Sequence, residues 1–285
     1  MRFDSLNADL RRWLQTSIGA GHDSEVLQQA LRAAGCDSGF ARQAVEAALA
    51  RSRPVGAAVV QSQPMAEPFA SSTNTIATSD RTVEILMTLG SPRIVLFGDL
   101  LSAHECEQMI DASRRRLQRS TVVNAETGAY DVHADRTSNG THFERGENPL
   151  VARIEARISE LVGCPAENGE PLQVLHYVPG AEYKPHHDYF AVAQPGNDSV
   201  LAMGGQRIAT LVMYLNDVEA GGSTVFPSLG LDVLPRQGSA VYFAYTSESG
   251  ETDPRTLHGG SPVLAGEKWI ATKWLRQRRY GGPGG

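Results

Sequence analysis

The sequence contains few cysteines. Cys36, Cys106 and Cys164 are the only three in 285 residues, and none of them forms a Cys-x-x-Cys pair. Small secreted domains that depend on disulfides carry many more cysteines, usually in even numbers. A disulfide scaffold is therefore excluded, and the sparse, odd set predicts a protein of the reducing cytoplasm.

Long apolar runs and an excess of positive charge are also absent. No apolar stretch approaches the ~18 residues of a membrane helix, and the first residues, MRFDSLNADLRRW, contain no apolar signal core. The 26 Lys and Arg against 32 Asp and Glu give a net charge of −6, which excludes nucleic acid as the main partner. These absences together predict a soluble protein that uses neither a membrane nor a nucleic acid.

Residues 1–52 predict a small bundle of three amphipathic helices. In the first helix, apolar side chains recur with helical spacing on one face. The second follows Asp23 or Ser24 as N-cap and stops at Gly35, and the third follows Asp37 or Ser38. The bundle resembles ubiquitin-associated-type modules, which implies a protein partner, and a packing or oligomerisation appendage is the alternative. The apolar residues of the first helix are Leu6, Leu10, Leu14 and Ile18, with Trp13 beside them.

The rest of the chain changes character twice. Residues 53–80 are rich in small residues, Pro, Ser and Thr without periodicity, which predicts a flexible linker. Residues 81–280 contain short β-rich runs separated by turn residues, with two helices, one beginning at a Ser102–Glu105 capping box and one in NPLVARIEARISELVG. This pattern predicts a mainly β domain, an antiparallel sandwich or barrel with flanking helices. Residues 281–285 are expected to form a flexible tail.

The octet YKPHHDYF, residues 183–190, raises the question of a metal site. Side chains alternate between faces in an extended segment, so His186 and Asp188 point to one side and His187 to the other. A third ligand must come from elsewhere, and His258 is the best candidate because Gly259 and Gly260 allow the backbone to crowd a site. His22 and His104 belong to helical segments, and His176 is expected to pack against the sheet.

Two histidines and one carboxylate are the ligand set of non-haem Fe(II) oxygenases. A zinc site with a bound water uses the same residue types. The ligand types alone therefore do not distinguish iron from zinc. Lys268 lies in the apolar strand KWIATKWL, and a buried lysine is costly unless it meets an anion. It therefore predicts a carboxylate guest such as an α-keto acid, unless the strand is an edge strand with Lys268 at the surface.

Three stretches together resemble the catalytic domain of prolyl 4-hydroxylases, the Fe(II)/2-oxoglutarate dioxygenases of collagen, plant and bacterial type. They are YVPGAEYKPHHDYF, RIATLVMYLNDVEAGGSTVFP and LHGGSPVLAGEKWIATKW, and the resemblance extends over roughly residues 82–278. It implies a double-stranded β-helix, or jelly roll, and a reaction that consumes 2-oxoglutarate and O₂ and hydroxylates prolyl residues at C4. Ascorbate is implied as the reductant.

The resemblance also implies roles for individual residues. His186, Asp188 and His258 would bind iron, and Lys268 would pair with the C5 carboxylate of 2-oxoglutarate. Tyr177 and Thr224 would line the same cofactor pocket. The residues implied to contact the peptide are Tyr183, Arg207 and Trp274, with Arg136 and Ser138 in a mobile loop, DRTSNG, that folds over it.

Two positions depart from the family pattern. His187 stands where an aromatic residue is common, and Arg276 stands where relatives carry histidine. Three other functions remain alternatives: a related oxygenase acting on another residue or a small molecule, a binding module centred on the helical bundle, and a zinc hydrolase. An intact triad together with Lys268 favours the prolyl hydroxylase.

Overall fold

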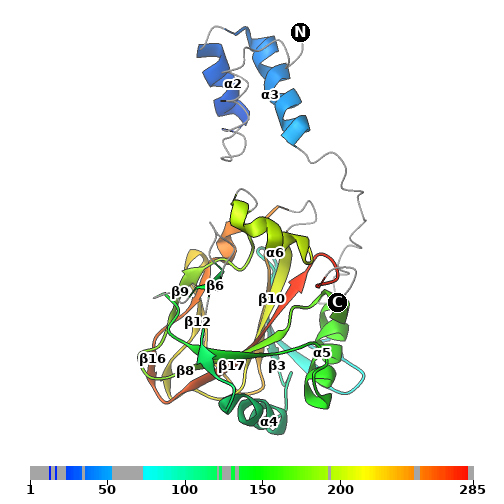
Figure 1. The fold of residues 1–285 in the computed structure, drawn as a ribbon, viewed down its shortest axis with the longest axis vertical. Helices are drawn as coiled ribbons and strands as arrows, with labels where there is room; N and C mark the ends of the chain where they lie inside the picture. Colours follow the sequence, from blue (N-terminus) through cyan, green and yellow to red (C-terminus); the bar gives the residue numbers. More distant parts are fainter. Residues whose placement is uncertain are drawn as a thin grey trace. The chain divides into compact units, whose positions relative to one another are not determined.

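The computed structural model divides the chain into two units, residues 1–62 and 63–285 (Figure 1). It describes residues 24–33, 36–52, 73–120, 122–123, 130–131, 135–191, 194–246 and 251–281, together with Trp13 and Ser17. Among the helices in these ranges, none combines the length and apolarity that crossing a bilayer requires.

The N-terminal unit contains helices α2 (Ser24–Ala33) and α3 (Ser38–Ser52). The Asp37 carboxylate accepts a hydrogen bond from the backbone N–H of Phe40 at 2.9 Å, which caps α3 as predicted. Two of the three predicted helices are thereby confirmed, whereas the first, with Leu6, Leu10, Leu14 and Ile18, lies outside the described residues except for Trp13 and Ser17. The two helices share a small core of Leu27, Leu31, Ala41, Ala44, Val45 and Ala48.

The prediction of a flexible linker over residues 53–80 is wrong at its C-terminal end. Strand β1 (Thr75–Ala77) pairs antiparallel with β2 (Thr82–Leu89), and Ile76 packs on the main core. Ser79 then donates two hydrogen bonds to Glu160, and Asp80 forms an ion pair with Arg157 at 2.6 Å. Three residues are too few to show a strand period in the sequence, and the anchoring partners lie about 80 residues away. Residues 53–72 and 282–285 lie outside the described residues.

The larger unit is built on a nine-stranded antiparallel sheet. Its order is β1-β2-β3-β14-β10-β17-β8-β7-β4. The bounds of the other strands are β3 (Ile94–Gly98), β4 (Gln118–Arg119), β7 (Asn139–Phe143), β8 (Leu172–Tyr177), β10 (Arg207–Tyr214), β14 (Ala240–Ala244) and β17 (Lys268–Arg276).

A second, four-stranded sheet has the order β13-β12-β15-β9. Its strands are β9 (Tyr183–His186), β12 (Thr224–Phe226), β13 (Leu231–Val233) and β15 (His258–Gly260). Side chains of both sheets meet in one apolar core, where Phe226 packs edge-on to Phe243 with ring centroids 5.2 Å apart. Two facing antiparallel sheets of this kind form a jelly roll, which confirms the predicted fold class. Two short pairs complete the strands: β5 (Val122–Val123) with β6 (Tyr130–Asp131), and β11 (Ala220–Gly221) with β16 (Val263–Ala265).

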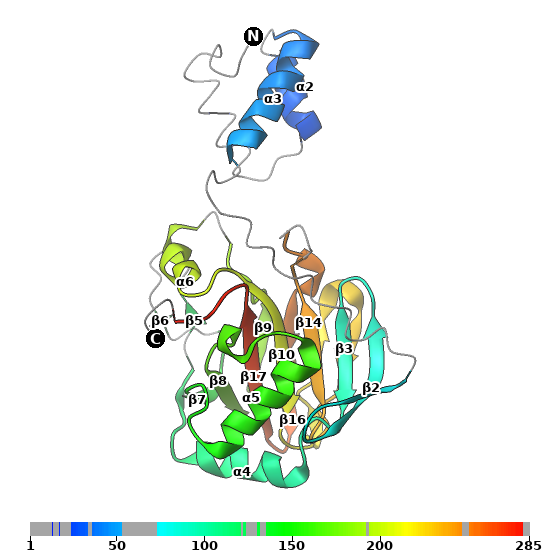
Figure 2. The ribbon, with the colours of Figure 1, turned by 90° about the vertical axis from the view of Figure 1, so that its right-hand side faces the viewer.

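Two helices cover the outer face of the large sheet (Figure 2). Helix α4 (Ala103–Arg114) begins at the predicted capping box, in which Ser102 and Glu105 each accept a hydrogen bond from the other's backbone N–H. Helix α5 (Pro149–Val162) ends where Gly163 adopts a left-handed conformation, with φ of 64°. The remaining helical segments are α6 (Asp198–Ala202) and the 3-10 turns η2 (Ala166–Asn168), η3 (Pro195–Asn197), η4 (Pro227–Leu229) and η5 (Pro254–Thr256).

Strand β17 shows how the two layers create the site. Trp269, Ala271 and Leu275 face the helices, whereas Lys268 and Ile270 face the space between the sheets. Because both faces of the strand are covered, its sequence shows almost no polar alternation. A lysine on the inner face of such a strand lies inside the molecule, not at an edge.

Candidate metal centre and its pocket

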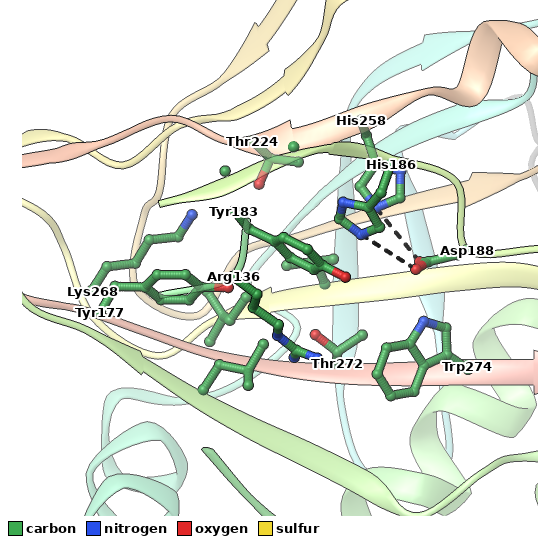
Figure 3. Close-up of a pocket in the computed structure, with 15 residues that line it drawn as sticks. Arg136, Tyr177, Tyr183, His186, Asp188, Thr224, His258, Lys268, Thr272 and Trp274 are labelled. Atoms are coloured by element: carbon green, nitrogen blue, oxygen red, sulfur yellow. Dashed lines mark ion pairs between the residues drawn. The ribbon is translucent and has the colours of Figure 1, made fainter. Parts of the chain in front are cut away.

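The two candidate histidines lie opposite each other on neighbouring strands. The β9–β15 register pairs His186 with His258, and Asp188 follows two residues after the end of β9. The Asp188 carboxylate is 3.6 Å from Nε2 of His186 and 3.5 Å from Nε2 of His258. The three ligand atoms all lie within 4.8 Å of one another, so the predicted set converges on one point (Figure 3).

Each imidazole has its Nδ1 engaged by the backbone. Nδ1 of His186 is 2.9 Å from the carbonyl oxygen of Lys184, and Nδ1 of His258 is 3.0 Å from that of Thr256. A carbonyl can only accept a hydrogen bond, so the proton sits on Nδ1 and Nε2 presents its lone pair. Both rings are therefore oriented and protonated as metal ligands require.

Charge in the cluster also suits a cation. Burial raises the pKa of the Asp188 carboxyl, but His258, His186 and Arg207 more than offset this and hold that pKa far below its usual range. Burial lowers the pKa of His258 to about 4. At neutral pH the cluster thus contains an ionised carboxylate and a neutral His258, the forms in which these side chains bind metals.

Asp188 is held by Arg207 and by two residues that the sequence analysis did not single out, Thr210 and Tyr245. Its Oδ2 accepts a hydrogen bond of 2.7 Å from Thr210, whose hydroxyl lies 3.1 Å from that of Tyr245. Its backbone carbonyl accepts a bond of 3.2 Å from Arg207. The one available signal was a threonine inside the apolar run IATLVMY, which is too common in strands to indicate a role.

Lys268 lies in the same pocket and is only 2% exposed. Within the described residues no carboxylate pairs with its ammonium and no hydrogen bond reaches it, and burial lowers its pKa to about 7. Its Nζ lies 5.4 Å from the centre of the Tyr177 ring, and Tyr214 donates a hydrogen bond of 2.7 Å to Thr224 nearby. This end of the pocket therefore offers a cation and hydroxyl groups to an anionic guest.

One pocket connects the triad to Lys268 (Figure 3). Of the residues predicted to bind cofactor or substrate, Arg207 and Ser138 do not line it, and the others do. The lining comprises Arg136, Leu175, Tyr177, Tyr183, His186, Asp188, Val212, Thr224, His258, Gly259, Gly260, Lys268, Ile270, Thr272 and Trp274.

The segment DRTSNG packs against the edge of β9. Arg136 forms a β-bridge with Tyr183, and its guanidinium lies 4.9 Å from the centre of the Tyr183 ring. That ring in turn stacks on His186 with centroids 3.7 Å apart. Ser138 is fully buried and donates a hydrogen bond of 3.0 Å to Ser120. The segment therefore joins the pocket wall through Arg136, and its mobility stays a prediction.

Arg207 is occupied by protein groups. It forms an ion pair of 2.6 Å with Glu170, and its guanidinium lies 4.1 Å from the centre of the Trp274 ring. Its contact with a substrate therefore stays a prediction, whereas its hold on Asp188 is visible.

The two departures from the family pattern lie away from the triad. His187 stacks on Tyr189 at 4.6 Å and does not join the ligand cluster. Arg276 is fully buried, pairs with Glu170 at 3.1 Å and donates to the carbonyl of Val200 in α6. Arg276 on β17 thus connects the large sheet to α6.

Two of the histidines that were not expected to bind metal, His176 and His104, lie as expected. His176 stacks on Trp269 with centroids 4.2 Å apart, on the outer face of the sheet, and His104 is exposed in the first turn of α4. His22 lies outside the described residues.

Comparison with known proteins assigns the chain to a family. A profile of the 2OG-Fe(II) oxygenase superfamily matches residues 172–276. Prolyl 4-hydroxylase 1 of Arabidopsis thaliana is 47% identical over 204 residues, which span 66% of this chain and 70% of that protein. The chain belongs to the prolyl 4-hydroxylase family. This membership makes it a 2-oxoglutarate-dependent dioxygenase that uses Fe(II) and O₂.

Two further relatives of the prolyl 4-hydroxylase family are informative. Prolyl 4-hydroxylase subunit alpha-1 of Homo sapiens is 42% identical over 188 residues, 66% of this chain and 35% of that protein. The crystal structure of a viral collagen prolyl hydroxylase from Paramecium bursaria Chlorella virus-1, in complex with 2OG, superimposes with a TM-score of 0.52 at 29% identity. That alignment covers 64% of this chain and 95% of the viral one. All three matches cover about two thirds of the chain.

Proposed function

We propose that the protein hydroxylates prolyl residues of a peptide or protein, with Fe(II) held by His186, Asp188 and His258 and 2-oxoglutarate held at Lys268. The observation that carries the proposal is the combination of these groups in one pocket: a cation-binding set of three ligands and a buried ammonium without an acidic partner in the described structure. A zinc hydrolase would have no use for the ammonium.

The donor set fits iron. Two Nε2 lone pairs and one ionised carboxylate lie within 4.8 Å of one another, in a pocket that extends to Lys268. When bound, Fe(II) with 2-oxoglutarate activates O₂, so that one oxygen atom hydroxylates the substrate and the other enters succinate as CO₂ is released. The protein orients the reactants and keeps water from the site.

The cofactor end is lined by hydroxyl groups as well as by Lys268. Tyr177 and Thr224 offer hydrogen bonds to a carboxylate that meets the ammonium, and Ile270 and Val212 line the pocket between the two ends. An anion that binds here offsets the free-energy cost of burying the Lys268 ammonium. The site therefore favours a guest that carries one carboxylate for the metal and a second one for Lys268.

The peptide would approach from the side of Tyr183, Arg136 and Trp274, which line the pocket near the triad. Stacked and amphipathic side chains of this kind suit a prolyl ring and its flanking amides. Arg207 and Ser138 would support this surface from behind, through Glu170 and Ser120.

Hydroxylation of a proline-rich peptide tests the proposal. We expect succinate formation that depends on the peptide, together with 4-hydroxyproline in the product by mass spectrometry. A matched peptide with alanine in place of proline should support neither. Hydroxylation of another residue or of a free small molecule would favour the alternative oxygenase.

Binding of 2-oxoglutarate should take up a proton above neutral pH. The free protein holds Lys268 with a pKa of about 7, so at pH 8 the amine is mostly neutral, and a carboxylate partner restores the ammonium. Tyr177 and Tyr214 face the amine, and burial raises the pKa of both, so they stay protonated. Calorimetry under argon, at pH 8 in two buffers of different ionisation enthalpy, should reveal uptake of up to about one proton that vanishes near pH 6. A binding enthalpy independent of the buffer at pH 8 would contradict the role of Lys268.

Three further predictions accompany the proposal. Ascorbate as reductant rests on the family resemblance, and a protein partner for residues 1–52 rests on their helical pattern. The cytoplasmic location rests on the cysteine content.

A further inference from the structure

Asp188 differs from the two histidines in how it is positioned. His186 and His258 lie on paired strands, so the β9–β15 ladder fixes both. Asp188 lies beyond the end of β9, where no ladder bond holds it. Asp188 is nevertheless only 7% exposed, and its carboxylate points at both imidazoles. An anchor outside the ladder must therefore set the carboxylate.

The side chain of Thr210 provides that anchor. Thr210 lies on β10, in the middle of the large sheet, and is fully buried. Its hydroxyl is 2.7 Å from Oδ2 of Asp188 and 3.1 Å from the hydroxyl of Tyr245, which is 1% exposed. The carboxylate of Asp188 is thus tied to the central strand of the large sheet by one hydroxyl.

The hydrogen bonds that link Tyr245, Thr210 and Asp188 can run in one direction only. An ionised carboxylate only accepts, so Thr210 donates to Asp188 and its own oxygen is left to accept from Tyr245. Burial raises the pKa of Tyr245 well above its ordinary value, so the phenol keeps the proton that it donates. Each hydroxyl is therefore locked in one rotation.

We propose that Thr210 is a positioning residue for the metal: it fixes the rotation of the Asp188 carboxylate in front of His186 and His258, and Tyr245 fixes Thr210. The inference rests on the proposed metal site. Pre-orientation removes the cost of ordering the carboxylate when the ion binds, and groups that orient metal ligands contribute about 10- to 100-fold to affinity.

Cobalt(II) binding tests this without turnover, since Co(II) suits the same ligands and its visible spectrum reports coordination geometry. We expect Thr210→Val, which keeps the shape but removes the donor, to weaken Co(II) binding about 10- to 100-fold and to alter the spectrum. Thr210→Ser, which keeps the donor, should restore most of the affinity. Tyr245→Phe should have a smaller effect in the same direction.

The double variant Thr210→Val, Tyr245→Phe separates positioning from folding. It removes both hydroxyls, so no buried phenol is left without a partner, and the apo protein should melt close to wild type. Its Co(II) affinity should still be as weak as that of Thr210→Val. As a matched control, Ser113→Ala removes a buried hydroxyl on α4, outside the pocket lining, and should leave Co(II) binding unchanged.

Different failures have different meanings. If wild type binds Co(II) and Thr210→Val binds it equally tightly with the same spectrum, the positioning role is wrong and the metal site stands. If Thr210→Ser is as weak as Thr210→Val, the hydroxyl is not the operative group and the inference fails. If wild type shows no Co(II) spectrum that depends on Asp188, the proposed metal site fails, and the inference fails with it.

Discussion

Replacement of His186 by alanine should abolish peptide-dependent succinate formation. The substitution removes one of three protein ligands, and the remaining pair is too small a set to hold a divalent ion in a fixed geometry. Because the metal supplies several kcal/mol of transition-state stabilisation, we expect a loss of about 1000-fold or more. Labelled 2-oxoglutarate converted to succinate, measured with and without peptide, gives the rate.

The neighbouring histidine provides the control. His187 is adjacent in sequence, carries the same ring and stacks on Tyr189 outside the ligand cluster. His187→Ala should therefore keep most of the activity of wild type. Undiminished turnover in His186→Ala, or an equal loss in both variants, would refute the assignment of the ligand.

Replacement of Lys268 by methionine should separate function from stability. Methionine fills the space without the charge, so 2-oxoglutarate loses its cationic partner, and its KM should rise about 100-fold or more. The free protein, by contrast, loses an ammonium that has no acidic partner within the described residues, so its stability should be equal or greater. Initial rates against 2-oxoglutarate concentration and urea unfolding measure the two effects.

The same strand offers a matched lysine. Lys273 is as buried as Lys268, but it faces the helices and forms an ion pair with Glu155. Lys273→Met leaves that carboxylate buried and unpaired, so it should lower the free energy of unfolding by about 3–5 kcal/mol. The KM for 2-oxoglutarate should not change in the folded variant. A rise in KM common to both variants would mean that the effect of Lys268→Met is general disturbance of the strand.

The sequence was most informative where local rules decide the structure. Alternation in an extended segment separated His186 from His187, and the Ser102–Glu105 box located the start of α4. An apolar strand containing Lys268 indicated an anionic guest, because the cost of burying a charge does not depend on the register of the sheet. These inferences need only neighbouring residues.

The remainder of the site depends on contacts between distant segments. Glu170 joins Arg207 to Arg276, and Thr210 joins Asp188 to Tyr245, over separations of 22 to 106 residues that no local pattern reports. The place of Arg207 behind the pocket, instead of in its wall, follows from the same network. The linker boundary was misplaced for the same reason, since β1 is defined by its pairing with β2.

Anaerobic titration with Fe(II) and 2-oxoglutarate tests the proposed pocket most directly. If the triad holds the metal while Lys268 holds the far carboxylate, the visible metal-to-ligand absorption of the chelate should appear only when both components are present, and saturate at one equivalent of each per chain. His186→Ala should show no such band, and Lys268→Met should require much more 2-oxoglutarate to produce it. Absence of the band in wild type, or its unchanged appearance in His186→Ala, would contradict the assignment.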